Sequence, residues 1–303
     1  MKYTLFYLIL LSFASVSCTH SQENDTENNT TLHYTKLTVP YKQIQGTDPD
    51  LLSLDLYYDP NRLSPKPVII WVHGGGWSIG DKNYQISHKI DFFAQMGYLF
   101  VSVNYRLSPY PYEVNNPNRL KFPVHITDVA DAVAWVHRHI RDYGGDPDQI
   151  VLMGHSAGAQ LVALAGSYHV FLQQAGVPVT AVKAVIPVDT RMYDVYNIIQ
   201  NYPPLDLYLN AFGDDPQQNI EASANRHLNS TDYFPRFLII KRGTPERMAH
   251  AEMFVDSLRQ NQIEVQQLET NPYSHSEVNE AIGMPDEQIV TPGIQSFLKN
   301  LFQ

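Results

Sequence analysis

The chain has 303 residues, of which 44% are hydrophobic and 17% charged, and its formal net charge at pH 7 is −10. This composition is that of a globular protein with a large core, which excludes a disordered chain. It also argues against a nucleic-acid-binding protein, because such binding requires clustered lysine and arginine to neutralise phosphates.

The first residues are expected to direct export and not to join the fold. Lys2 supplies a positive charge, and an almost unbroken apolar run extends from Tyr3 to Phe13. Small residues then precede Cys18, an order typical of an export signal over residues 1–17. The apolar run is too short for an ordinary membrane span. We therefore expect an exported protein of a bacterium.

Cys18 is the only cysteine, so no disulfide can form within the mature chain. It stands where a bacterial lipoprotein signal places the lipidated residue, although Ser15 occupies the position where such signals usually carry leucine. Lipidation predicts membrane anchoring in the periplasm or at the outer membrane or cell surface. The alternative is simple cleavage, which would leave a soluble periplasmic or secreted enzyme. Residues 18–34 are polar and predict a flexible tether.

Residues 35–303 predict a single domain. Thr35 to Gln45 and Leu52 to Tyr58 predict an N-terminal antiparallel hairpin, and the second of these alternates apolar with polar residues. Unalternating apolar runs, typical of strands covered on both faces, follow at intervals. Such strands are predicted at 67–72, 99–103, 149–153, 182–188 and 237–241, and a further strand is predicted at 263–269. Helices are predicted between them at 90–96, 128–143, 157–172 and 247–260, and a last one at 287–301.

Strands that alternate with helices predict an α/β fold, with a mostly parallel central sheet and helices on both faces. Ligands bind such sheets at the carboxyl ends of the strands. Two stretches do not fit the alternation. The loop at 108–123 is rich in Pro, Tyr and Asn, and residues 190–233 are the least regular part, which we interpret as a cap-like insertion.

The segment from Gly154 to Gly158, Gly-His-Ser-Ala-Gly, lies between a predicted buried strand and a predicted helix. Glycine has no Cβ, so strand and helix can approach closely while Ser156 adopts a strained turn that exposes its hydroxyl. Ser156 is therefore the candidate nucleophile, and a serine needs an adjacent base that an acid orients.

His275 follows the last predicted strand, where it can fold back over Ser156, and it is the candidate base. Glu246 is the candidate acid, because it is the only carboxylate in the turn after the preceding strand. The order serine, acid, histidine is that of this catalytic design. A helix-start glutamate is the ordinary alternative reading of Glu246. Asp189, at the end of the strand before that, is the rival acid.

His73-Gly74-Gly75-Gly76-Trp77 follows another buried strand and predicts an oxyanion hole. The backbone N–H groups of Gly75 and Gly76, together with that of Ala157, are the candidate donors to the charge that develops on a carbonyl oxygen. Trp77 and His155 are candidate substrate contacts.

In combination these motifs resemble the α/β-hydrolases of the esterase and lipase branch related to hormone-sensitive lipase. The stretch Trp77 to Lys82 is similar to feruloyl/acetyl esterase-like and arylformamidase-like members. In the turn that usually carries aspartate this chain has Glu246, and Arg242 replaces a common histidine. The motifs that carry the resemblance are His73–Trp77, Asn104–Leu107, Gly144–Pro147, Gly154–Gly158 and Ser274–Ser276.

The resemblance implies an α/β-hydrolase fold and a serine esterase that cleaves carboxylic esters through an acyl-enzyme, without a metal or organic cofactor. The expected substrates are small-molecule or carbohydrate esters, with short acyl chains or acylated sugars. An amide substrate such as an arylformamide is the alternative within enzymes. A non-catalytic ligand-binding homologue is the alternative outside them, and the presence of both Ser156 and His275 argues against it.

Overall fold

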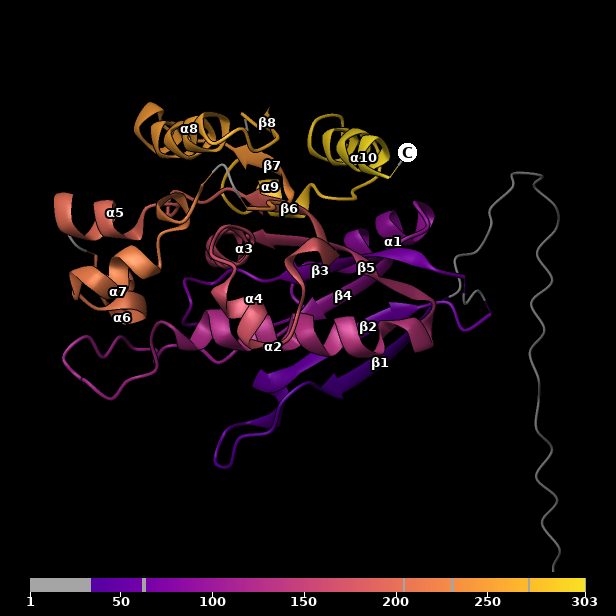
Figure 1. Cartoon of the computed structure of the whole chain (residues 1–303), viewed down its shortest axis with the longest axis horizontal. Helices are drawn as coiled ribbons and strands as arrows, with labels where there is room; N and C mark the ends of the chain where they lie inside the picture. The colour runs from indigo at the N-terminus through magenta and orange to yellow at the C-terminus, as the bar shows by residue number, and fades with distance from the viewer. Residues whose placement is uncertain (1–33, 62–63, 204, 230–231, 272, 303) are drawn as a thin grey trace, which may run out of the picture. The chain divides into compact units, whose positions relative to one another are not determined.

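An eight-stranded sheet runs through the middle of the fold (Figure 1). The structure is a computed structural model that describes residues 34–302, except 62–63, 204, 230–231 and 272. The predicted export signal, Cys18 and the predicted tether up to residue 33 lie outside the described residues. None of the helices in the described part has the length and apolar character needed to cross a membrane.

The strand order is β1-β2-β4-β3-β5-β6-β7-β8. The β1/β2 and β2/β4 pairs are antiparallel, and all later neighbours are parallel, so the predicted hairpin and parallel sheet are both confirmed. The strands are β1 Thr35–Pro40, β2 Ser53–Tyr58, β3 Lys66–Val72, β4 Leu99–Val103, β5 Gly145–His155, β6 Val182–Val188, β7 Arg236–Lys241 and β8 Val265–Glu269.

Helices alternate with the strands after β3 and cover the sheet. The α-helices are α1 Ser87–Gln95, α2 Val124–His139, α3 Ala157–Ser167, α4 Val170–Gln174, α5 Val195–Asn201, α6 Asp206–Phe212, α7 Pro216–Glu221, α8 Pro245–Gln260, α9 Glu277–Glu280 and α10 Val290–Leu301. The short 3-10 helices are η1 Pro49–Leu52, η2 Ile140–Tyr143, η3 Val179–Ala181 and η4 Ala224–Arg226.

Two apolar cores lie on opposite faces of the sheet, because successive side chains of a strand point to opposite sides. On β3, Val68, Ile70 and Val72 pack into the core that α2, α3 and α8 cover. Ile69 and Trp71 of the same strand pack into the core that α1 and α10 cover. Burial on both faces explains why the central strands read as continuous apolar runs.

The prediction of an irregular segment over residues 190–233 is wrong in detail. This segment, which we call the α5–α7 insertion, contains three short helices and η4. Asp194 and Asp215 cap two of the helices, since each side chain accepts a hydrogen bond from the backbone N–H three residues later. The helices have only six or seven residues, too few for an apolar period to be visible in the sequence.

The predicted helix over 157–172 is divided into α3 and α4, because Tyr168 adopts an extended conformation after α3.

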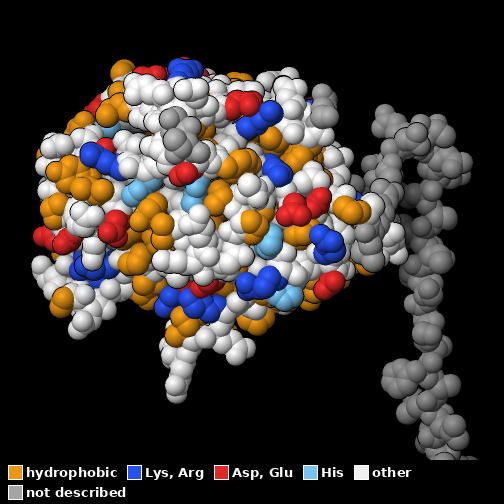
Figure 2. Space-filling model, in the orientation of Figure 1, with side chains coloured by type: hydrophobic (Ala, Val, Ile, Leu, Met, Phe, Trp, Pro, Cys, Tyr) orange, Lys and Arg blue, Asp and Glu red, His pale blue; other side chains and the backbone are white. Residues whose placement is uncertain are grey.

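On the face drawn in Figure 2, basic and acidic side chains are interspersed among apolar and neutral ones. The charges on that face therefore form a mixed surface.

Candidate active site

Ser156 lies at the sharp turn between β5 and α3. Its backbone has φ 56° and ψ −111°, a conformation that non-glycine residues rarely adopt. The two glycines of the motif allow this turn. A Cβ added to Gly158 would lie 2.1 Å from the backbone oxygen of Val72, and one on Gly154 would lie 2.6 Å from the backbone of Gly158. Only glycine permits this approach of helix to strands, as the sequence predicted.

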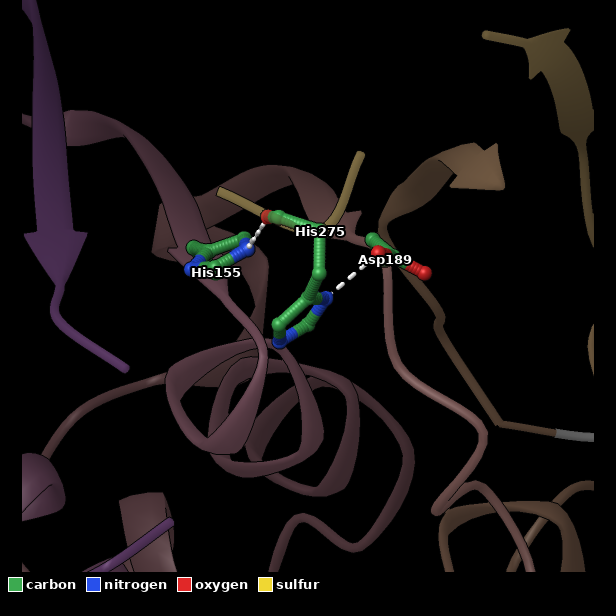
Figure 3. Close-up of side chains that lie close together, drawn as sticks. All are labelled: His155, Asp189 and His275. Carbon is green, nitrogen blue, oxygen red and sulfur yellow. Dashed lines mark hydrogen bonds and ion pairs between the residues drawn. The ribbon is translucent and has the colours of Figure 1, made fainter. Parts of the chain in front are cut away.

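His275 joins Ser156 to Asp189 through two hydrogen bonds, and Figure 3 shows the one to Asp189. Its Nε2 lies 2.9 Å from Oγ of Ser156, and its Nδ1 lies 2.5 Å from Oδ2 of Asp189. The loop between β8 and α9 carries His275, whereas Asp189 directly follows β6. Because β6 is the neighbour of β5 in the sheet, the turn after it lies beside Ser156. The carboxylate accepts the Nδ1 proton, which leaves Nε2 free to accept the proton of the serine hydroxyl.

The structure contradicts the prediction that Glu246 holds the imidazole. The Glu246 side chain is 62% exposed in the first turn of α8, and its nearest basic partner is Arg191, with 3.9 Å between Oε1 and Nη1. Asp189, the rival acid, makes the contact with His275. The physical reason is that the turn after β7 and the first turn of α8 contribute arginines to this site. Arg242 and Arg247 both point to Asp189.

Asp189 is almost fully buried, with 1% of its side chain exposed. Nε of Arg247 lies 2.8 Å from Oδ1, and Nη1 of Arg242 lies 3.0 Å from Oδ2. Burial alone would raise the pKa of Asp189, but the hydrogen bond from His275 and the charge of Arg247 outweigh it and hold the pKa below its ordinary value. The carboxylate is therefore ionised at neutral pH and able to stabilise a protonated imidazole.

The sequence analysis named His155 as a candidate substrate contact, but in the structure this residue supports the loop of His275. The side chain is buried, and its ring lies 4.6 Å from that of His275 (Figure 3). Its Nε2 is 2.8 Å from the backbone oxygen of His275. A carbonyl oxygen only accepts, so Nε2 carries the proton and donates. Burial, and then the proximity of His275, lowers the pKa of His155 to about 3, so its ring is neutral.

Residues Gly74–Trp77, which we call the glycine segment, follow β3 and lie directly beside Ser156. A Cβ on Gly74 would be 3.1 Å from Cβ of Ser156. Gly75 has φ +103°, and its carbonyl accepts hydrogen bonds from Ser78 and Ile79, which closes a tight turn. Gly76 has φ +60°. The turn thus holds the predicted N–H donors of Gly75 and Gly76 in a fixed segment next to the serine.

Ala157, the third predicted donor, is the first residue of α3. The N–H groups in the first turn of a helix have no acceptor within the helix, so they are free for a ligand. His73, the residue before the glycine segment, supports this segment. Its ring stacks on Tyr105 with 4.5 Å between centroids, and Nδ1 lies 2.7 Å from the Gly74 oxygen. Burial lowers the pKa of His73 to about 4, so this ring is also neutral.

Trp77 was a candidate substrate contact, but only 3% of it is exposed. Its Nε1 donates to Oε1 of Gln160 over 3.3 Å, and its ring packs edge-on against Phe212 with 4.8 Å between centroids. Trp77 therefore joins the glycine segment to α3 and α6. In the sequence it could not be distinguished from a substrate contact, because its partners come from two distant helices.

Among the described residues, one cluster has the side-chain types that bind metals, and it is His155, Asp189 and His275. Their ligand atoms lie within 4.8 Å of one another. In this arrangement both ring nitrogens of His275 and Nε2 of His155 take part in hydrogen bonds. The geometry is that of a hydrogen-bond chain from Ser156 through His275 to Asp189.

A family model described as BD-FAE matches residues 54–245, which include the glycine segment, Ser156 and Asp189. The chain belongs to the BD-FAE family. This membership agrees with the resemblance to α/β-hydrolases of the esterase branch that the sequence motifs indicated. The match ends before the loop of His275.

Relatives of this BD-FAE family member include named esterases. It is 33% identical over 210 residues to "Probable carboxylic ester hydrolase LipM" of Mycobacterium tuberculosis (strain ATCC 25618 / H37Rv), which covers 64% of this chain and 45% of LipM. It is 44% identical over 115 residues to "Esterase LipQ" of the same organism, which covers 37% of this chain and 25% of LipQ. The chain thus matches less than half the length of each of these two relatives.

Solved structures of esterases share the fold. A "truncated form of carbohydrate esterase from gut microbiota" has a TM-score of 0.69 at 16% identity, and covers 90% of this chain and 98% of that one. Esterase B from Lactobacillus rhamnosis has a TM-score of 0.63 at 20% identity, and covers 88% and 84%. The predicted α/β-hydrolase fold is confirmed.

Proposed function

We propose that this BD-FAE family member hydrolyses carboxylic esters, with Ser156 as nucleophile, His275 as base and Asp189 as the acid that orients the imidazole. The observation that carries the proposal is the continuous hydrogen-bond chain from Ser156 Oγ through His275 to Asp189. The names of the relatives LipM and LipQ support the same reaction class. A non-catalytic ligand-binding role would not need this chain.

In the proposed reaction, Oγ of Ser156 attacks the carbonyl carbon of the ester while its proton passes to Nε2 of His275. Asp189 stabilises the imidazolium that forms. The N–H groups of Gly75, Gly76 and Ala157 donate to the oxyanion of the tetrahedral intermediate. When the ester C–O bond breaks, His275 gives the proton to the leaving alcohol, and an acyl group remains on Ser156.

The acyl-enzyme is then hydrolysed by the same groups. His275 takes a proton from water, whose oxygen attacks the acyl carbon, and a second tetrahedral intermediate forms at the same donors. Its collapse releases the carboxylic acid and returns the proton to Ser156. One ester and one water thus give one acid and one alcohol, and every proton that moves passes through Nε2 of His275.

We expect short acyl groups to be preferred. Leu207 of α6 lies over the glycine segment, because a Cβ on Gly76 would be 2.6 Å from its Cδ1. Apolar carbons therefore occupy the space beside the proposed oxyanion site, which restricts the acyl group. Small-molecule esters and acylated sugars remain the proposed substrates.

The decisive experiment compares the wild-type protein with Ser156→Ala on 4-nitrophenyl acetate. We expect the variant to lose at least three orders of magnitude in kcat/KM, because loss of the nucleophile removes the acyl-enzyme route. The melting temperature is expected to stay within a few degrees. A phosphonate ester should label the wild-type protein at Ser156, as detected by peptide mass spectrometry. Activity of Ser156→Ala within tenfold of wild type would contradict the proposed function.

A further inference from the structure

Arg191 lies two residues after Asp189, in the loop that leads from β6 to α5. Its guanidinium carbon is 5.8 Å from the centroid of the Tyr202 ring and 5.9 Å from that of Tyr208. The side chain is 22% exposed, and its one acidic neighbour within 4.0 Å among the described residues is Glu246, at 3.9 Å. Arg191 is thus a partly buried cation close to two tyrosine rings.

This guanidinium makes no hydrogen bond to any described residue, and its Nε is buried without an acceptor. The Glu246 oxygen at 3.9 Å is too far for a hydrogen bond. His250 packs against Tyr202 with 5.4 Å between ring centroids. Its Nε2, like Nε of Arg191, is buried without a hydrogen-bond partner among the described residues. Only 6% of His250 is exposed. Buried polar groups are nearly always paired, so the guanidinium of Arg191, which is part exposed and without a hydrogen bond to any described residue, indicates a polar ligand at this place.

The position of Arg191 connects it to the proposed catalytic groups. Its loop begins at Asp189, the partner of His275. Tyr208, on its other side, packs against Trp77 of the glycine segment with 6.2 Å between centroids. Arg191 therefore connects the loop that begins at the acid with the helix α6, which covers the proposed oxyanion site.

We propose that Arg191 binds a carboxylate group of the ester substrate, so that the preferred substrates are esters with an anionic acyl or alcohol part. The proposal rests on the proposed ester hydrolysis. The planar guanidinium can donate two parallel hydrogen bonds to a carboxylate, and the flanking tyrosine rings hold its plane. Glu246 is exposed and lies 3.9 Å from Arg191. It balances the charge of Arg191 in the free protein, and the substrate carboxylate takes its place on binding.

Two pairs of esters test the proposal, and each pair differs by one charge. Mono-4-nitrophenyl adipate is compared with 4-nitrophenyl hexanoate for the acyl side, and 4-acetoxybenzoate with 4-acetoxybenzamide for the alcohol side. The quantity measured is the ratio of kcat/KM for the anionic ester to that for its neutral partner. The pair whose ratio changes when Arg191 is substituted identifies the side of the ester, acyl or alcohol, that carries the bound carboxylate.

Arg191→Gln is expected to lower the ratio about tenfold or more in one of the two pairs, because a hydrogen bond to a charged group is lost. Arg191→Lys, which keeps the charge but not the planar fork, should lower it less. Glu246→Gln is expected to raise the same ratio a few-fold, since it removes the competing carboxylate. Arg259→Gln is the matched control. It makes the same charge change as Arg191→Gln, but in the last turn of α8, at the opposite end of that helix from Glu246, and should leave both ratios unchanged.

Unchanged ratios in Arg191→Gln and Glu246→Gln for both pairs would overturn the proposal. If Arg191→Gln fails to fold, Arg191→Lys and Glu246→Gln decide, because they shift the ratio in opposite directions. Binding separates this proposal from the proposed function. In a Ser156→Ala background, adipate or benzoate should perturb the NMR signals of the loop after Asp189, and Arg191→Lys should weaken this binding. Absence of binding contradicts the carboxylate site, whereas absence of hydrolysis by the wild-type protein contradicts only the ester hydrolase.

Discussion

Asp189 accepts hydrogen bonds from an imidazole and from two guanidinium groups while it is almost fully buried. A buried carboxylate is costly unless it is paired, and Arg242 and Arg247 compensate for this cost. They also fix both carboxylate oxygens, one each. The orientation of His275 therefore depends on one residue of the turn after β7 and one of the first turn of α8, neither of which has a described hydrogen bond to His275.

The first prediction at this scale distinguishes Asp189 from Glu246. Asp189→Asn is expected to lose about 10²–10⁴ in kcat, because the neutral amide cannot stabilise the imidazolium and favours the wrong tautomer. Glu246→Gln should hydrolyse 4-nitrophenyl acetate within about threefold of wild type. Steady-state kinetics of both variants provide the measurement. The opposite pattern, an active Asp189→Asn and an inactive Glu246→Gln, would return the acid to α8.

Ser156 and the glycine segment could be predicted from the sequence because each follows a recognisable apolar strand, and His275 because it follows the last predicted strand. The acid could not be assigned between Asp189 and Glu246. Both carboxylates follow strands, and chain order is the same for either one. What decides is the pair of arginines after β7, whose side chains point to Asp189. Two arginines in that turn were visible in the sequence, but the direction of their side chains was not.

At the scale of elements, the most constrained contact is that between α3 and the strands β5 and β3. It places the start of α3 against the backbone of Val72, so that no side chain fits between them. The strands and long helices were predictable because their apolar periods extend over many residues. The three helices of the α5–α7 insertion were not, although Asp215-Pro216, a cap followed by proline, is a helix-start signal.

Gly158→Ala tests this contact. The added methyl group would overlap the Val72 oxygen, so α3 must shift, and we expect a loss of about 3 kcal/mol in the free energy of unfolding. Gly176→Ala is the matched control. It has φ +82° and open space around it, so only backbone strain of about 1–2 kcal/mol is expected. Urea denaturation provides both values. A smaller loss for Gly158→Ala than for Gly176→Ala would refute the close contact.

At the scale of the whole molecule, the three buried histidines with the most strongly lowered pKa values couple folding to pH. Burial lowers the pKa of His73 to about 4 and those of His125 and His155 to about 3. In the unfolded chain each titrates near 6.5. Their contribution to stability is therefore fully present above pH 6.5 and is lost as the pH falls, because the unfolded state binds the additional protons.

We expect the free energy of unfolding to decrease below about pH 6, with a slope that approaches 4 kcal/mol per pH unit, about 1.4 for each histidine. His125→Gln, which keeps a polar group beside Ser108, should reduce the slope by one such increment. Denaturation curves at several pH values between 7 and 4.5 measure it. A stability that does not change over this range would contradict the neutral state of these rings.

Export and lipidation remain predictions, since residues 1–33 are outside the described part of the chain. If Cys18 carries lipid, the protein expressed in a Gram-negative host should fractionate with membranes and incorporate labelled fatty acid. Cys18→Ser should lose the label and be either released or left unprocessed. Ser17→Ala is the control and should keep the label. A native protein found only in the soluble fraction and without label would exclude the anchor.

The hydrogen bond from His155 to the backbone oxygen of His275 has a consequence over the time course of a turnover. The bond between Ser156 and His275 must break each time the serine is acylated, and form again when water regenerates it. The bond from His155 takes no part in these steps. His155 and Ser156 are adjacent in the chain. The hydrogen bond from His155 therefore keeps the turn of Ser156 joined to the loop of His275 while the bond between the Ser156 and His275 side chains breaks and forms again. The imidazole then returns to the same place in every cycle without a search.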